Sequence, residues 1–124
     1  MPFDSSSPSR TVEILDTLSE FLRCGDLHWM QYPKTGTEPP RSACLLEAMD
    51  QVRHDYKEAV KFDHIAALLA TAIQGFASTR ADINNNAVTE YNDAKGRTLE
   101  DILCVIGKAR ALAQIDAPLL TVPF

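Results

Sequence analysis

Six side chains combine aromatic surface with charged or hydrogen-bonding groups, the combination from which small-ligand pockets are built. They are Trp29, Tyr32, His54, Tyr91, Asp93 and Arg97. An acid at Asp93 and an anion-binding guanidinium at Arg97 would suit a small polar ligand. Turn chemistry accounts for the same residue types around Asp93, so the stretch is open to two interpretations, a binding site or a structural corner.

No catalytic group or metal ligand can be assigned from spacing. A nucleophile requires a base within hydrogen-bond reach, and Cys44 is followed by Leu45 and Leu46, which predicts a buried thiol of low reactivity. Cys24 and His28 have the spacing of a ligand pair, but a structural zinc site normally supplies a second such pair. We therefore expect no catalytic residue, no metal and no cofactor.

The composition limits the class of protein. A chain of 124 residues with 45% hydrophobic and 23% charged residues is typical of one globular domain. No apolar run reaches the roughly 18 residues of a membrane span, and a net charge of −5 opposes binding to nucleic-acid phosphates. The three cysteines are odd in number and widely spaced, which favours reduced thiols in the core. We expect a soluble, cytoplasmic protein that binds neither membrane nor nucleic acid.

The elements that would position these residues are helices. Apolar residues recur three and four positions apart in four segments, residues 11–25, 42–60, 63–76 and from 99 onward. Ser42 and Asp63 are expected to be N-caps, and a short connecting helix is expected over residues 85–91. The predicted fold class is therefore all-α: a single small domain of about four helices plus the short connecting helix, with no sheet.

The stretch EYNDAKGRT, residues 90–98, predicts a tight corner before the last helix. Asn92 tolerates turn conformations, and Gly96 can adopt a positive φ without steric cost. Thr98 and Asp101 have the spacing of a capping box, in which each side chain accepts a hydrogen bond from the other residue's backbone. This pattern indicates that the helix begins at the end of the corner.

The predicted organisation is a disordered lead over residues 1–10, a helical domain over residues 11–117 and an extended apolar tail over residues 118–124. Residues 31–41 contain three prolines and one glycine, which predicts a surface loop. The tail, PLLTVPF, carries no charge, and its prolines exclude a helix. Its side chains need a cover, either between the first and third helices of the same chain or on a second copy in a two-fold dimer. The dimer is favoured.

Three motifs occur in order along the chain: HWMQY, CLLEAM and YNDAKGRTLEDILCVIGKARALA. Together they resemble a domain-of-unknown-function family of small bacterial and phage helical proteins, over residues 12–113. That family has a Trp-containing loop, a Cys-x-x-Gly-Ala-Leu helix and a Trp-Asn-Asp corner followed by Gly-x-Thr. Here Tyr91 stands where Trp is usual and Glu47 where Gly is usual. The resemblance implies an all-helical domain and transfers no activity.

Two functional hypotheses follow. The favoured one is a non-enzymatic helical module that binds an unknown protein partner or itself as a homodimer. The alternative is a small-ligand-binding protein or minor enzyme with a pocket near Trp29, His54, Tyr91 and Asp93. A DNA-binding helix is the least favoured, because Lys108 and Arg110 are the only basic residues of the last predicted helix after its first turn.

Overall fold

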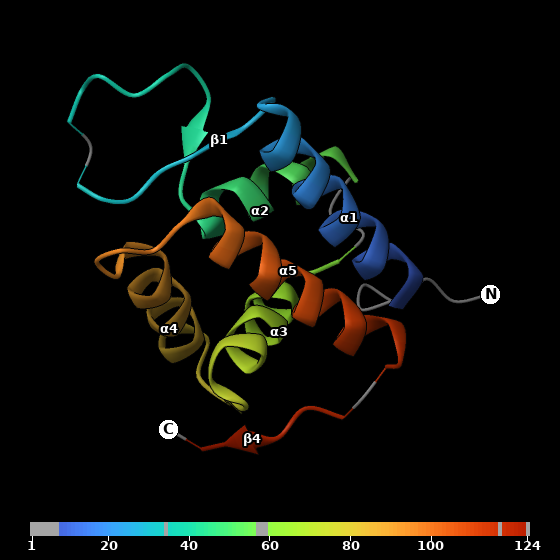
Figure 1. The fold of residues 1–124 in the computed structure, drawn as a ribbon. Helices are drawn as coiled ribbons and strands as arrows, with labels where there is room; N and C mark the ends of the chain where they lie inside the picture. The colour runs from blue at the N-terminus through green and yellow to red at the C-terminus, as the bar shows by residue number, and fades with distance from the viewer. Residues whose placement is uncertain (1–7, 34, 57–59, 117, 124) are drawn as a thin grey trace.

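The computed structural model describes residues 8–33, 35–56, 60–116 and 118–123, which form a helical body with two very small sheets (Figure 1). The helices are α1 (Pro8–Cys24), α2 (Leu45–Asp55), α3 (Phe62–Gln74), α4 (Ala81–Asp93) and α5 (Leu99–Gln114). The strands pair in parallel, β1 (His28–Trp29) with β2 (Ser42–Ala43) and β3 (Ala77–Ser78) with β4 (Thr121–Val122). A mostly α-helical fold is therefore confirmed, and the predicted absence of any sheet is wrong. Strands of two residues are too short to produce the alternating pattern by which a strand is recognised.

Helix α5 lies at the centre of the body and packs against both α1 and α3 (Figure 1). Helix α3 also packs against α4, and α2 packs against α1 and α4. Large apolar side chains with no more than 1% of their surface exposed come from all five helices and from two connecting segments; they include Ile14, Leu15, Leu18, Leu27, Leu45, Met49, Val52, Val60, Ile65, Leu69, Val88, Ile102 and Ile106. One contiguous apolar core thus joins the helices that the periodicity predicted.

The start of α5 is the one predicted in most detail, and the prediction is confirmed. Thr98 is the N-cap, and its Oγ1 accepts a hydrogen bond from the Asp101 amide at 3.2 Å. In return, the Asp101 carboxylate accepts one from the Thr98 amide at 3.1 Å. The corner therefore ends in a complete capping box.

The predicted N-caps of α2 and α3 are wrong. Ser42 lies in β2, and α2 begins after Cys44, whose amide donates to the Glu47 carboxylate at 3.2 Å. Asp63 lies in the first turn of α3, after Lys61 as the N-cap. In both cases a polar residue near the helix start was mistaken for the cap because backbone pairing, which fixes the true first residue, is not visible in the sequence.

Three helices differ in extent from the sequence interpretation. Helix α4 has 13 residues, whereas the sequence predicted a short helix over residues 85–91. Helix α1 begins at Pro8, so the last three residues of the predicted lead are helical, and residues 1–7 lie outside the described part of the chain. Helix α2 runs from Leu45 to Asp55 with Tyr56 as its C-cap, whereas the sequence predicted a helical segment over residues 42–60, of which residues 57–59 lie outside the described part of the chain.

The cysteines are all free, but only one is in the core. Cys44 is buried, as predicted, and burial raises the pKa of its thiol. Cys24 and Cys104 are exposed, so the expectation of three core thiols is wrong. A surface thiol on an amphipathic helix cannot be distinguished by spacing from one on the flank of its apolar face.

Residues 30–33 and 35–41 belong to a wide loop that projects from the helical body (Figure 1). Its base is held by the β1–β2 pair, in which His28 is aligned with Ser42 and Trp29 with Ala43. Glu38 organises the tip by accepting hydrogen bonds from the amides of Thr35 and Gly36 at 2.8 and 3.0 Å. The predicted loop therefore has a defined base and a defined turn.

The tail lies along its own chain at the junction of α3 and α4, where β4 pairs with β3. Leu119 packs against the core. The sequence analysis favoured a tail that lies on a second copy, and its intrachain alternative placed the tail between the first and third helices rather than beside β3. None of the helices in the described ranges is long and apolar enough to cross a membrane.

Candidate functional site

Asn92, in the last turn of α4, is the centre of a buried polar cluster. Its side chain has 1% of its surface exposed. Its Oδ1 accepts hydrogen bonds from Trp29 Nε1 at 2.7 Å and the Leu45 amide at 3.0 Å. Its Nδ2 donates to the Met30 carbonyl at 3.0 Å and to Asp93 Oδ1 at 2.9 Å. Both donors and both acceptor positions of the amide are thus used; we call these five residues the Asn92 clasp.

A second set of bonds joins the projecting loop to the end of α4. Gln31 Nε2 donates to the carbonyls of Asn92 and Ala94 at 3.0 and 2.8 Å. The Tyr32 amide donates to Asp93 Oδ1 at 3.1 Å. The loop after β1 and the C-terminal end of α4 are therefore held as one unit.

The buried face of α4 explains why an asparagine occupies this position. Asn84, Val88 and Asn92 are spaced four residues apart, so they lie on one side of the helix, and all three are buried. Asn84 Oδ1 accepts from the Ser78 amide at 2.7 Å, and its Nδ2 donates to the Ser78 carbonyl at 3.0 Å. Each end of α4 thus holds a neighbouring segment through one amide. The sequence analysis treated Asn92 as a turn residue, although the Asn-x3-Val-x3-Asn spacing could have revealed this face.

Tyr32 connects the loop to the start of α2. Its hydroxyl donates to Glu47 Oε1 at 2.6 Å, and the same oxygen accepts from the Cys44 amide. The hydrogen bond to Glu47, followed by desolvation, raises the pKa of Tyr32 to about 12. The Glu47 carboxylate therefore accepts hydrogen bonds both from the start of α2 and from the loop.

We expect the Tyr32 phenol to titrate near pH 12 rather than near its ordinary pKa of 10. Because folding raises this pKa, the stabilisation from the neutral phenol is fully present below pH 10 and is lost as the pH rises towards 12. Absorbance of tyrosinate after rapid pH jumps, with the Tyr32→Phe signal subtracted, would measure it. Glu47→Gln should lower the midpoint towards 10, whereas the exposed-site control Glu90→Gln should not. A wild-type midpoint near 10 would contradict the assignment.

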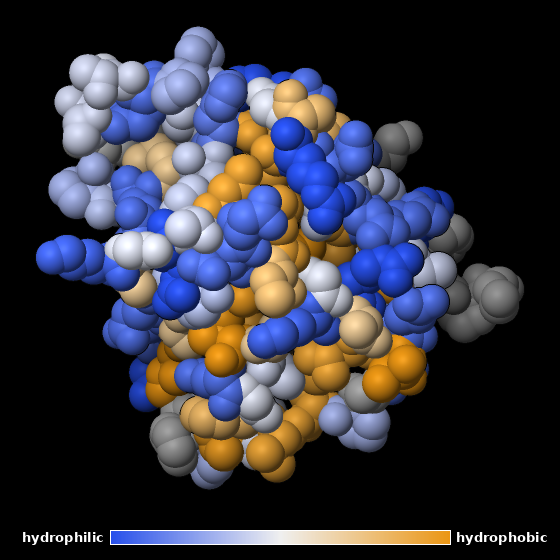
Figure 2. Space-filling model, viewed as in Figure 1, coloured by the Kyte–Doolittle hydropathy of each residue, from blue (hydrophilic) through white to orange (hydrophobic). Residues whose placement is uncertain are grey.

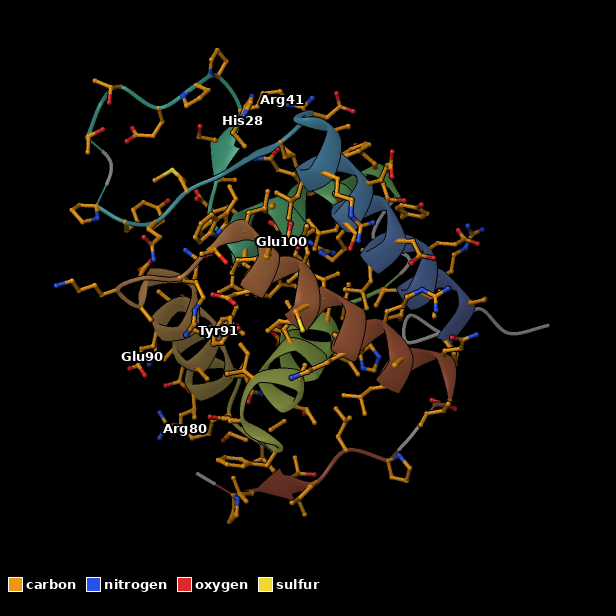
Figure 3. The ribbon with its side chains drawn as sticks, viewed as in Figure 1. His28, Arg41, Arg80, Glu90, Tyr91 and Glu100 are labelled. Atoms are coloured by element: carbon orange, nitrogen blue, oxygen red, sulfur yellow. The ribbon has the colours of Figure 1, made fainter. Side chains whose placement is uncertain are left out.

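Tyr91 and Arg97 form a separate contact on the corner. The Arg97 guanidinium carbon lies 3.5 Å from the centre of the Tyr91 ring, a cation–π arrangement. Arg97 Nε donates to the Tyr91 carbonyl at 2.8 Å, and Nη1 lies 3.7 Å from Asp101 Oδ2. Figure 3 shows Tyr91 on α4 beside the start of α5. The guanidinium therefore folds back over the corner and is held by Tyr91 and Asp101.

The structure brings together five of the six residues predicted for a pocket. Trp29, Tyr32 and Asp93 meet at the Asn92 clasp, and Tyr91 and Arg97 lie on the adjoining corner. His54 is exposed near the other end of α2, roughly 14 Å along the helix axis from Leu45. Ligand binding at these residues stays a prediction.

The described residues contain no group of three His, Cys, Asp or Glu side chains placed to hold a metal ion. The ring and amide nitrogens that would face a ligand at the clasp instead donate to other residues of the chain. The chemistry available at the clasp is therefore hydrogen bonding that joins three segments of the fold.

A different surface is open to solvent. The C-terminal ends of α3 and α5 border an apolar groove of about 510 Å³, lined by Thr71, Ala72, Gly75, Lys108, Ala111, Leu112 and Ile115. Ile115 has 72% of its surface exposed, and Leu120 in the tail has 66%. Figure 2 shows hydrophobic side chains gathered on the lower face of the molecule, where Figure 1 places the tail. We call the groove together with Leu120 the C-terminal apolar face.

Most of the chain matches a known family. A family model described as "Family of unknown function (DUF6197)" matches residues 6–112. The searches of curated proteins and of solved structures returned no match.

Proposed function

Since the chain belongs to the DUF6197 family, a family of unknown function, we propose that it is a non-enzymatic module that assembles with itself. The resemblance to a domain-of-unknown-function family is confirmed by the match over residues 6–112. The bacterial source and cytoplasmic location expected from the sequence remain part of this proposal.

The C-terminal apolar face carries the proposal. Ile115 and Leu120 are large aliphatic side chains with most of their surface exposed, and Ile115 also lines the groove. Contiguous exposed apolar surface with a polar rim is typical of protein–protein contacts. Among the described residues that line the groove, Lys108 is the one cation and supplies a polar group beside the apolar side chains. A two-fold dimer would cover this face with the same face of a second copy, and two-fold dimers are the commonest assembly.

The alternative of a ligand pocket near Trp29, His54, Tyr91 and Asp93 has less support. The Trp29 indole and the Asp93 carboxylate bond to Asn92, and Arg97 stacks on Tyr91. A ligand at these residues would have to displace hydrogen bonds that hold the loop in place. Breaking such buried bonds without replacing them costs about 1–3 kcal/mol for each group left unpaired.

We expect the full chain to be a dimer at tens of micromolar and Ile115→Lys to be monomeric. The lysine would place a charge within the buried contact, which is costly without a partner. Light scattering at several protein concentrations measures the assembly, and thermal denaturation shows whether the variant is folded.

Thr89→Lys is the matched control, because Thr89 is an exposed residue of α4 outside the C-terminal apolar face. It should remain dimeric. A wild-type chain that is monomeric at tens of micromolar would overturn the proposal.

A further inference from the structure

The small β3–β4 sheet has one closed edge and one open edge. On the closed side, the Asn84 side chain accepts from the Ser78 amide and donates to the Ser78 carbonyl, as a neighbouring strand would. On the other side lies β4, and among the described residues no third strand follows it. An open strand edge is a template for pairing with another chain.

The direction of the backbone groups of β4 follows from its pairing with β3. The amides of Ala77 and Thr79 donate to the carbonyls of Leu120 and Val122 at 2.9 and 2.8 Å. Backbone groups of successive strand residues point to opposite edges. The amide and carbonyl of Thr121, which lies between these two acceptors, therefore point to the open edge. Thr121 is also exposed.

We propose that the open edge of β4 pairs antiparallel with the same edge of a second copy, with Thr121 facing Thr121 of that copy on the two-fold axis. The inference rests on the proposed self-assembly and specifies its contact. In a hydrogen-bonded antiparallel pair the two residues exchange both N–H···O bonds. Two copies of Thr121 can do so with identical geometry.

The flanking residues fit this register. Two positions away, Leu119 would face Pro123 of the second copy, whose nitrogen has no hydrogen to donate. The Leu119 carbonyl already accepts from its own Thr121 Oγ1 at 3.2 Å, so the missing donor leaves no unpaired acceptor. Pro123 therefore lies opposite a carbonyl that does not require an N–H donor from the second copy. The two-fold axis produces the same Leu119–Pro123 pair at each end of the paired strands.

The side chains fit as well. In the same register Leu120 faces Val122 of the second copy, at a non-hydrogen-bonded position where side chains approach most closely. Residues 118–123 carry no charge, so no like charges oppose each other across the axis. Edge strands are usually protected by charges, and this edge has only its two flanking prolines. A second copy of this chain therefore satisfies both the backbone and the side chains of β4.

Thr121→Pro tests the backbone bond, because it removes an N–H that β3 does not use. The dimer Kd should rise by more than about tenfold with two interchain bonds lost, while the melting temperature of the monomer should stay near the wild-type value. Thr121→Val, which keeps the N–H, should still dimerise. If Thr121→Pro dimerises like the wild type while Ile115→Lys is monomeric, the edge pairing is wrong and the proposed function stands. A wild-type monomer overturns both.

Crosslinking gives a second readout that does not depend on how well Thr121→Pro folds. Cα atoms of a hydrogen-bonded pair are about 5.5 Å apart, within the range of a disulfide. In a background with Cys24→Ser and Cys104→Ser, Thr121→Cys should therefore form a covalent dimer on mild oxidation. Pro118→Cys should not, because its two copies would lie roughly 20 Å apart. A dimer by light scattering in which Thr121→Cys does not crosslink, or crosslinks no more than Pro118→Cys, would overturn the pairing.

Discussion

Replacing Asn92 with aspartate is expected to lower the free energy of unfolding by about 3–5 kcal/mol. The new carboxylate would keep the acceptor for Trp29 Nε1 but lose the Nδ2 donor to the Met30 carbonyl. It would also bury a charge beside Asp93, whose Oδ1 now lies 2.9 Å from Nδ2. The variant therefore combines an unpaired carbonyl with repulsion between two carboxylates.

Urea denaturation followed by fluorescence of Trp29, the single tryptophan, would measure this loss at the cluster itself. Asn86→Asp is the control, because Asn86 is exposed on the same helix; its change should be within about 0.5 kcal/mol. Protonation restores a donor, so the Asn92→Asp protein should regain part of its stability as the pH falls. Equal losses in the two variants would show that the clasp contributes little.

Ile106→Ala is expected to lower the free energy of unfolding by about 2–5 kcal/mol, the usual cost of truncating an isoleucine in a close-packed core. Ile106 has 1% of its surface exposed, on the face of α5 that packs in the core. Ile115→Ala is a matched truncation at the C-cap of the same helix, where 72% of the side chain is exposed. We expect this second change to stay within about 0.5 kcal/mol in dilute samples.

Chemical denaturation of the two variants at low protein concentration would measure the difference. Low concentration matters because dimerisation stabilises the folded state by mass action. If Ile115→Ala cost as much as Ile106→Ala under these conditions, the C-terminal apolar face would have to be covered within the chain.

Sequence reasoning located the helices whose signals are local. Helices α3 and α5 have a regular apolar spacing. The start of α5 could be predicted because its capping box is formed by Thr98 and by Asp101, which lies in the first turn of the helix. Helix α4 was predicted too short because two of its three buried residues are asparagines, which an apolar pattern does not count. The strands were missed because each pair joins segments that are far apart in the chain.

The candidate site was predicted in part for a related reason. Residue types correctly grouped Trp29 and Tyr32 with Asp93, which the structure places at one cluster. Asn92, which joins them, was missed because a buried amide is uncommon and becomes visible only when its four partners are known. His54 was included by type alone, because spacing does not encode which end of α2 lies at the cluster; the structure places the Leu45 end there.

The closed base of the projecting loop has a consequence for how the chain length can change. Residues 30–41 leave the body at Trp29 and return at Ser42, and these two points are fixed by the β1–β2 pair and the Asn92 clasp. Added residues at the loop tip would therefore change the local turn around Glu38 and the entropy of closing the loop, and would leave the base in place. Doubling a flexible loop costs only about 0.6 kcal/mol. The tip near Gly36 is thus the position at which a peptide tag or an additional domain can be inserted while the helical body keeps its packing.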